Sequence, residues 1–119
     1  MAASLTITGF HDSIDYKVVN CTSIEDATVF VNVTESAGTL YAAYINSANC
    51  NANVSLHILD GKDQSNSEII IKGAATEIRS LQIPKGFAFD MLNFRVSANS
   101  AEDDTTDFAG TVSVTLICS

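Results

Sequence analysis

The chain has no tryptophan, a single proline and few basic residues, and each shortage narrows what the protein can be. Lys and Arg together number 6 against 14 acidic residues, which gives the 119-residue chain a net charge of −8. Proteins that bind nucleic acids or anionic membranes need clustered cations, so neither kind of partner is expected. The charged fraction of 17% lies below the usual value of about 25%.

Targeting signals and long apolar runs are missing as well. Residues 1–10 contain no basic segment followed by an apolar run of about 7–15 residues, so we expect no signal peptide. No run approaches the roughly 20 apolar residues that a membrane-spanning helix needs. These observations predict a protein made in the cytoplasm, with a single domain over residues 1–119.

Side chains that could carry chemistry are scarce. Cys21, Cys50 and Cys118 lack the paired spacing of a zinc site. We expect them to be mostly reduced and buried, with Cys118 the most exposed, and a Cys21–Cys50 disulfide is the alternative. His11 and His57 are the candidates for a general base near neutral pH, and we expect both on the surface. Since no motif of a hydrolase, metalloprotease or phosphate-binding loop occurs, we predict no enzyme and no cofactor.

Two loops are acidic enough to raise the question of calcium binding, because hard cations prefer several converging carboxylates. Neither loop has the spacing or the flanking helices of an EF-hand. We therefore interpret both as solvated acidic surface that keeps the protein soluble, and predict no metal site. The acidic residues are Asp60, Asp63 and Glu68 in the first loop and Glu102, Asp103, Asp104 and Asp107 in the second.

What the chain does contain is alternation of apolar and polar residues. A period of two with β-branched residues is typical of half-buried strands, and Val29, Val31 and Val33 show it clearly. Segments of this kind recur about every ten to twelve residues, which indicates an all-β sandwich or barrel. The expected strands are 4–10, 13–19, 27–34, 39–46, 52–59, 68–73, 76–83, 87–98 and 110–117.

The connections refine this prediction. Residues 84–86, Pro-Lys-Gly, are expected to form a turn, and residues 99–107 form the longest polar loop. Within 87–98 the apolar residues change face near Asp90 and Met91, which predicts a β-bulge or a corner between two strands. Eight or nine strands with such a corner favour an antiparallel, jelly-roll-like β-sandwich.

Some apolar residues fall on faces that a single core would not use. If the valines of 27–34 face the core, Phe30 points outward, and the strands 39–46 and 68–73 are apolar on both faces. Apolar residues on both faces of a strand mean that both faces are covered. We therefore propose Phe30, Tyr41, Ile45 and Ile70 as candidate protein–protein contacts.

In size, strand content and composition the whole chain resembles the small decoration (cement) proteins of tailed-phage capsids. This resemblance implies a viral structural protein located in the virion. It also implies a homo-oligomer, often a trimer, that contacts the major capsid protein. One alternative is a carbohydrate-binding, lectin-like module, disfavoured because Trp is absent and Tyr is rare. Another is a fibre or pilus subunit, disfavoured by the missing export signal.

Overall fold

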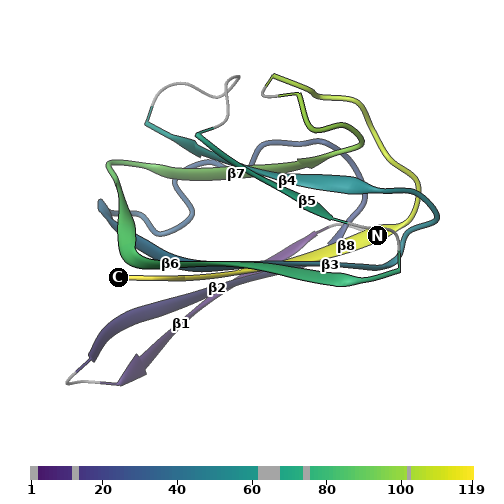
Figure 1. Ribbon diagram of the computed structural model, residues 1–119. Helices are drawn as coiled ribbons and strands as arrows, with labels where there is room; N and C mark the ends of the chain where they lie inside the picture. The colour runs from purple at the N-terminus through teal and green to yellow at the C-terminus, as the bar shows by residue number, and fades with distance from the viewer. Residues whose placement is uncertain (1–2, 12–13, 62–67, 74–75, 102) are drawn as a thin grey trace.

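The computed structural model describes residues 3–11, 14–61, 68–73, 76–101 and 103–119. These residues form two antiparallel sheets, one with the strand order β1-β2-β8-β3-β6 and one with the order β5-β4-β7 (Figure 1). Within the same ranges no helix is long and apolar enough to cross a lipid bilayer. The strands are β1 (Ser4–His11), β2 (Ile14–Ile24), β3 (Gly38–Asn49), β4 (Val54–Asp60), β5 (Ile69–Gly73), β6 (Ile78–Phe89), β7 (Leu92–Ser97) and β8 (Thr111–Cys118).

The strand pairs are nested along the chain. β2 pairs with β8, β3 pairs with β6, and β4 pairs with β5. An isolated bridge pairs Phe30 with Phe94 of β7. In the nested series this pair comes after β2–β8 and before β3–β6. One long hairpin rolled up on itself gives this pattern, and the further pairs β3–β8 and β4–β7 close the two sheets. This arrangement confirms the predicted antiparallel, jelly-roll-like sandwich.

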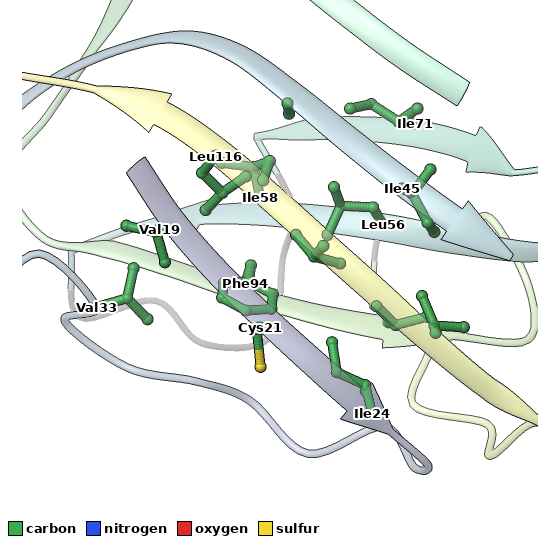
Figure 2. Close-up of a cluster of buried hydrophobic side chains, with 14 of the residues drawn as sticks. Val19, Cys21, Ile24, Val33, Ile45, Leu56, Ile58, Ile71, Phe94 and Leu116 are labelled. Carbon is green, nitrogen blue, oxygen red and sulfur yellow. The ribbon is translucent and has the colours of Figure 1, made fainter. Parts of the chain in front are cut away.

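The core lies between the two sheets (Figure 2). The inner faces contribute aliphatic side chains that alternate with half-buried ones, most regularly along β8. Leu56 and Ile58 of β4 and Phe94 of β7 are completely buried against the inner face of the larger sheet. Burial of this kind is the main source of the stability of a sandwich.

Ile45 belongs to this core, with 0% of its side chain exposed, so its interpretation as an outward contact residue is wrong. The reason is a β-bulge in β3, where the register to both neighbouring strands shifts between Leu40 and Ala42. A bulge moves the following side chains to the opposite face. Leu40, Ala43 and Ile45 therefore share the inner face, although their sequence positions suggest a strand that is apolar on both faces.

The segment 27–34 is not a strand, although its sequence alternates regularly. Phe30 donates to and accepts from the backbone of Phe94 at 2.8 and 3.0 Å, but Asn32 has a φ of 52°, which interrupts any ladder. The expected alternation also fails, because Phe30 stacks on Phe94 with 4.9 Å between ring centroids and Val31 is 43% exposed, whereas Val33 is buried in the core. The segment instead covers the outer edge of β7.

Residues 84–86 do not form the predicted turn but continue β6. Leu40 pairs with Phe87 and Ala42 pairs with Gln82, so four residues of β6 lie opposite Tyr41. Gly86 has a φ of 77°, and a Cβ at this position would collide with the side chain of Thr39. The corner that was predicted separately, at Asp90 and Met91, is present, because there the chain leaves the larger sheet and enters β7.

The position of Ile45 can be tested against an isoleucine that is 66% exposed, Ile78. We expect Ile45→Ala to lower the free energy of unfolding by about 2–5 kcal/mol, because it removes buried methyl groups and leaves a cavity. Ile78→Ala should change it by no more than about 0.5 kcal/mol. Urea denaturation followed by circular dichroism measures both. Equal effects of the two substitutions would contradict this placement.

The three cysteines are free and buried. Cys118 is 0% exposed, so the expectation that it is the most accessible thiol is wrong. It lies at the end of β8 opposite Leu40, on the inner face of the sheet. Burial raises the pKa of Cys21 to about 11. Burial also raises the pKa of Cys118 to about 11, and it outweighs the nearby Lys17, which acts to lower that pKa. Burial also raises the pKa of Cys50.

We expect the native protein to resist alkylation, because the thiolate is the reactive form. With a pKa of about 11, only about one thiol in a thousand is ionised at pH 8. Intact-mass measurement after treatment with iodoacetamide should show no modification of the native protein and three modified cysteines after denaturation without reductant. A rapidly modified native cysteine, or fewer than three modified residues after denaturation, would contradict this.

Candidate functional site

The outer face of the three-stranded sheet carries a polar layer that is buried. Inward residues of β4 and β7 are aliphatic or aromatic, and the alternate residues are polar except for Leu59. Each of these polar residues is at most 4% exposed, although a sheet face directed away from the core normally meets water. The members are Ser55, His57, Asn93, Arg95 and Ser97.

The connection between β7 and β8 covers part of this layer (Figure 1). Arg95 donates its Nε–H to the backbone oxygen of Asp104 at 2.8 Å, and Ala98 donates its backbone N–H to Thr106 at 2.9 Å. On the neighbouring side, Asn93 accepts from the backbone N–H of Asn32 at 2.7 Å and donates to the carbonyl of Gly61 at 2.9 Å. Buried polar groups with hydrogen-bond partners hold loops in place.

Three of the acidic residues that we predicted to be solvated also accept hydrogen bonds from loop backbone. Asp60 accepts from the N–H groups of Asp90 and Met91 at 2.9 and 3.2 Å. Asp107 accepts from Ala27 at 3.0 Å. The other loop residues Glu68 and Asp103 are exposed, and Asp63 and Glu102 lie outside the described residues. Within the described part of the chain, no three His, Cys, Asp or Glu side chains gather as metal ligands would.

Asp104 has the largest share of such bonds. Its carboxylate accepts from the hydroxyl of Thr106 at 2.8 Å and from the backbone N–H of Asn99 at 3.0 Å. Burial acts to raise the pKa of this carboxyl, but hydrogen bonds from Thr106 and Asn99 outweigh it and hold the pKa well below its ordinary value of 3.8. Asp104 is therefore ionised at neutral pH and fixes the shape of the loop over Arg95.

His57 and Ser97 form a pair that resembles a base and a nucleophile. The Nε2 atom of His57 lies 2.6 Å from the Ser97 hydroxyl and 3.2 Å from the carbonyl oxygen of Asn99. A carbonyl oxygen only accepts hydrogen bonds, so a hydrogen bond to Asn99 requires the tautomer in which Nε2 carries the proton. The Ser97 hydroxyl also donates to Asn99, at 2.9 Å. Both side chains are 0% exposed, so neither is accessible to a molecule in solution.

The expected surface position of His57 is thus wrong, because the loop after β7 covers this strand face. Burial lowers the pKa of His57, and the charge of Arg95 lowers it further, while Asn99 and Asp104 act in the opposite direction. His11 is the last residue of β1, and its side chain lies outside the described part of the structure.

A pocket of about 190 Å³ lies beside the polar layer. Its lining offers hydroxyl and amide groups and one cation, which are groups that hydrogen-bond small polar molecules. None of the lining residues belongs to the His57–Ser97 pair. The lining residues are Asn53, Ser55, Lys72, Gly73, Ala98, Asn99 and Ser100.

The four candidate contact residues do not form one surface. Ile45 is in the core, and Phe30 packs against the core as a partly buried residue. Tyr41 is half-buried in the larger sheet beside Gly86. Ile70 is half-buried in the smaller sheet opposite His57. Because Tyr41 and Ile70 lie in opposing sheets and do not belong to the core between them, a single flat partner cannot cover both.

A different apolar surface lies on β1. Leu5 pairs with Cys21 and Ile7 pairs with Val19, so both side chains lie on the inner face of the five-stranded sheet. Cys21 and Val19 are 0% and 1% exposed, but Leu5 is 40% and Ile7 is 41% exposed. Figure 1 shows β1 running out beyond the layer formed by β4, β5 and β7. The second sheet covers β2 and leaves β1 uncovered.

The sequence analysis placed Leu5 and Ile7 on the first strand but did not identify them as a surface. Their alternation indicates the face on which they lie, and no local signal reports how far the opposing sheet extends. The remaining large apolar residues that are exposed in the described structure are Val31 and, at the opposite edge of the same sheet, Ile78.

The burial of His57 predicts a loss of stability in mild acid. Its pKa is lowered in the folded state relative to the ordinary value of 6.5, so the unfolded chain takes up the proton more readily. The free energy of unfolding should therefore fall as the pH decreases from 6.5 toward the folded-state pKa. Urea denaturation at pH 7.5 and 5.5 measures this decrease.

The matched variants are His57→Gln and His11→Gln. His57→Gln should remove most of the pH dependence between 7.5 and 5.5, whatever its effect on stability at pH 7.5, and His11→Gln should retain it. A wild-type protein equally stable at both pH values, or a His57→Gln variant with an unchanged pH dependence, would contradict the role of this histidine.

Comparisons with known proteins report a weak similarity in structure and none in sequence. No family model matches the chain, and no curated protein matches it significantly. A solved structure from work on Bacillus endospore appendages, described there as a novel family of disulfide-linked pili, aligns with a TM-score of 0.45 and 14% sequence identity. The alignment covers 96% of this chain and 88% of that one. These comparisons do not assign the chain to a family.

Proposed function

We propose that the protein is a non-enzymatic structural subunit, which joins neighbouring subunits through the uncovered inner face of β1. The observation that carries this proposal is the exposure of Leu5 and Ile7, at 40% and 41%, on a sheet face whose other strands form the core. Apolar side chains on such a face gain free energy when another surface covers them, at roughly 25 cal/mol per Å² of apolar area.

The composition of β1 supports contact with another protein. Interface centres are depleted of charge and contain apolar anchors. The described residues of β1 include no acidic side chain, no lysine and no arginine, although the whole chain has a net charge of −8. Elsewhere on the protein most of the charged groups that an approaching subunit would meet are acidic, because the chain has 14 acidic and 6 basic residues.

The buried pair His57–Ser97 supports the non-enzymatic part of the proposal. A serine nucleophile needs an adjacent base and access to substrate. In this pair neither side chain is exposed, so a substrate has no access to them. The polar layer instead anchors the loop between β7 and β8 through Arg95 and Asp104.

Two kinds of assembly fit this role. A capsid decoration protein, located in the virion with itself and a major capsid protein as partners, is the form that size and composition favour. A fibre subunit is the alternative, and one observation favours it. Exposed apolar side chains occur at both edges of the five-stranded sheet, Leu5 and Ile7 on β1 and Ile78 on β6, and a head-to-tail contact between two different edges generates filaments.

The proposal predicts that Ile7→Asp abolishes association. Analytical ultracentrifugation over a range of concentrations should show the wild type above the mass of the 12.6 kDa monomer. Ile7→Asp should sediment as a monomer with an unchanged circular dichroism spectrum, because Ile7 lies outside the covered core. A buried charge without a partner costs several kcal/mol of association free energy.

Asn20→Asp is the control for added charge. Asn20 is exposed on β2, opposite Thr6, and an aspartate at this position can still accept the hydrogen bond from Thr115. Asn20→Asp should therefore assemble as the wild type does. A wild type that stays monomeric at the highest concentration, or an Ile7→Asp variant that assembles normally, would overturn the proposed function.

A further inference from the structure

We infer that β1 pairs antiparallel with the β1 of a second copy of the chain, about a two-fold axis that passes through Thr6. Two five-stranded sheets would then join into one continuous sheet of ten strands. This inference rests on the proposed function and names the partner and the strand that it uses.

The first argument compares the sheet edges that the structure describes. Unpaired strand edges attract other strands, and proteins protect them with proline, lysine, bulges, short length or covering segments. β6 contains Pro84 and Lys85 within its bulge opposite Tyr41. β5 has five residues, one of them Lys72. The edge of β7 is covered by the segment around Phe30.

β1 has none of these protections along Ser4–Gly9. It pairs with β2 without a register shift from Ser4 to Gly9, and its sequence contains no proline, lysine or arginine. No described residue pairs with its other edge. Among the described sheet edges, the edge of β1 is therefore the one whose backbone N–H and C=O groups can pair with a further strand.

The second argument identifies the occupant by charge. Two copies with a net charge of −8 each repel one another over most orientations. Residues 1–11 contain no acidic side chain, so contact along β1 brings the copies together where no carboxylates face each other. A basic partner would be drawn toward the acidic loops and would gain nothing from an uncharged strand.

The third argument is the self-complementarity of the strand. An axis at Thr6 places Leu5 of one copy opposite Ile7 of the other, and Ile7 opposite Leu5. These four side chains lie on the inner faces, where each is now about 40% exposed. Side chains directly opposite in an antiparallel pair have Cβ atoms about 4.5–5.5 Å apart, so the two pairs would cover one another.

Thr6 itself faces the other side, because its partner in β2 is the exposed Asn20. On the axis, Thr6 of one copy lies opposite Thr6 of the other. Opposite Cα atoms in an antiparallel pair are about 4.5 or 5.5 Å apart, and both values are within the range of about 4.4–6.8 Å that a disulfide spans. A cysteine at position 6 of one copy would therefore form a disulfide with the cysteine at position 6 of the second copy.

The test is oxidation of Thr6→Cys with glutathione at a protein concentration at which the wild type is associated. The native cysteines are buried and stay reduced, so the new thiol supplies the cross-link. Blocking with N-ethylmaleimide before non-reducing electrophoresis prevents later exchange. We expect most of the Thr6→Cys protein to run as a covalent dimer.

Ser4→Cys is the matched control, exposed on the same strand and on the same face. With the axis at Thr6, the two copies of residue 4 are separated by four residues along the strand, or about 13 Å, and should not cross-link. Ile78→Asp is the second control, and it should leave association unchanged because β6 takes no part.

The outcomes separate the two proposals. An associated wild type in which Thr6→Cys forms no dimer overturns the strand pairing and leaves the proposed function in place. Cross-linking of Ser4→Cys, but not of Thr6→Cys, overturns the register and the axis. Loss of association in Ile78→Asp indicates head-to-tail contact between β1 and β6 and likewise overturns the two-fold pairing. A monomeric wild type overturns both proposals.

Discussion

The nesting of strand pairs is the constraint on which the rest of this structure depends. Its outermost pair joins Lys17 of β2 to Cys118 of β8, residues from opposite ends of the chain. A long hairpin rolled in this way assigns alternate pairs of strands to the two sheets, and each sheet would receive four. The segment around Phe30 contributes a single bridge, while β1 adds a fifth strand to the other sheet. The two layers therefore differ in width, and this difference leaves Leu5 and Ile7 uncovered.

The irregular connections between the strands explain why several acidic groups are used inside the loops. A regular strand satisfies its backbone N–H groups in a ladder, whereas a loop packed over a sheet needs other acceptors. Asp60 and Asp107 supply them for residues on another turn or loop, and Asp104 supplies one within its own loop. Bonds from N–H groups to carboxylates are stronger than those to neutral acceptors. The excess of acid in this chain thus has a structural use in addition to its effect on solubility.

Much of the fold follows from the sequence because alternation reports burial directly. Seven of the expected segments coincide with parts of β1 to β6 and β8, and the corner at Asp90 and Met91 follows from the change of apolar face. The failures share one physical cause, which is that alternation does not say which element covers a face. Ile45 appears to lie on a second apolar face because the bulge at Tyr41 is invisible in the sequence. His57 appears exposed because the covering loop is polar.

The segments 27–34 and 84–86 fail for a related reason. Val31 and Val33 alternate as strand residues do, but Asn32 in the left-handed region breaks the ladder between them. Pro84 and Gly86 have the composition of a turn, yet both are accommodated in a wide bulge at a sheet edge, where a missing N–H group costs little. Local composition reports the backbone angles that a residue tolerates, and the tertiary pairing decides whether those angles reverse the chain.

The two edges of the large sheet differ in how they are protected, and this difference bears on the assembly that we propose. Contact between β1 and β6 would leave one β1 and one β6 free at the ends of every complex, and growth would continue. Pairing of β1 of one copy with β1 of another uses the unprotected edge of both copies. The two outer edges of the joined sheet are then both formed by β6. Pro84 and Lys85, with the bulge around them, interrupt the row of donors that a further strand would need. The distribution of proline, lysine and apolar residues along this sheet therefore favours a closed pair over a filament.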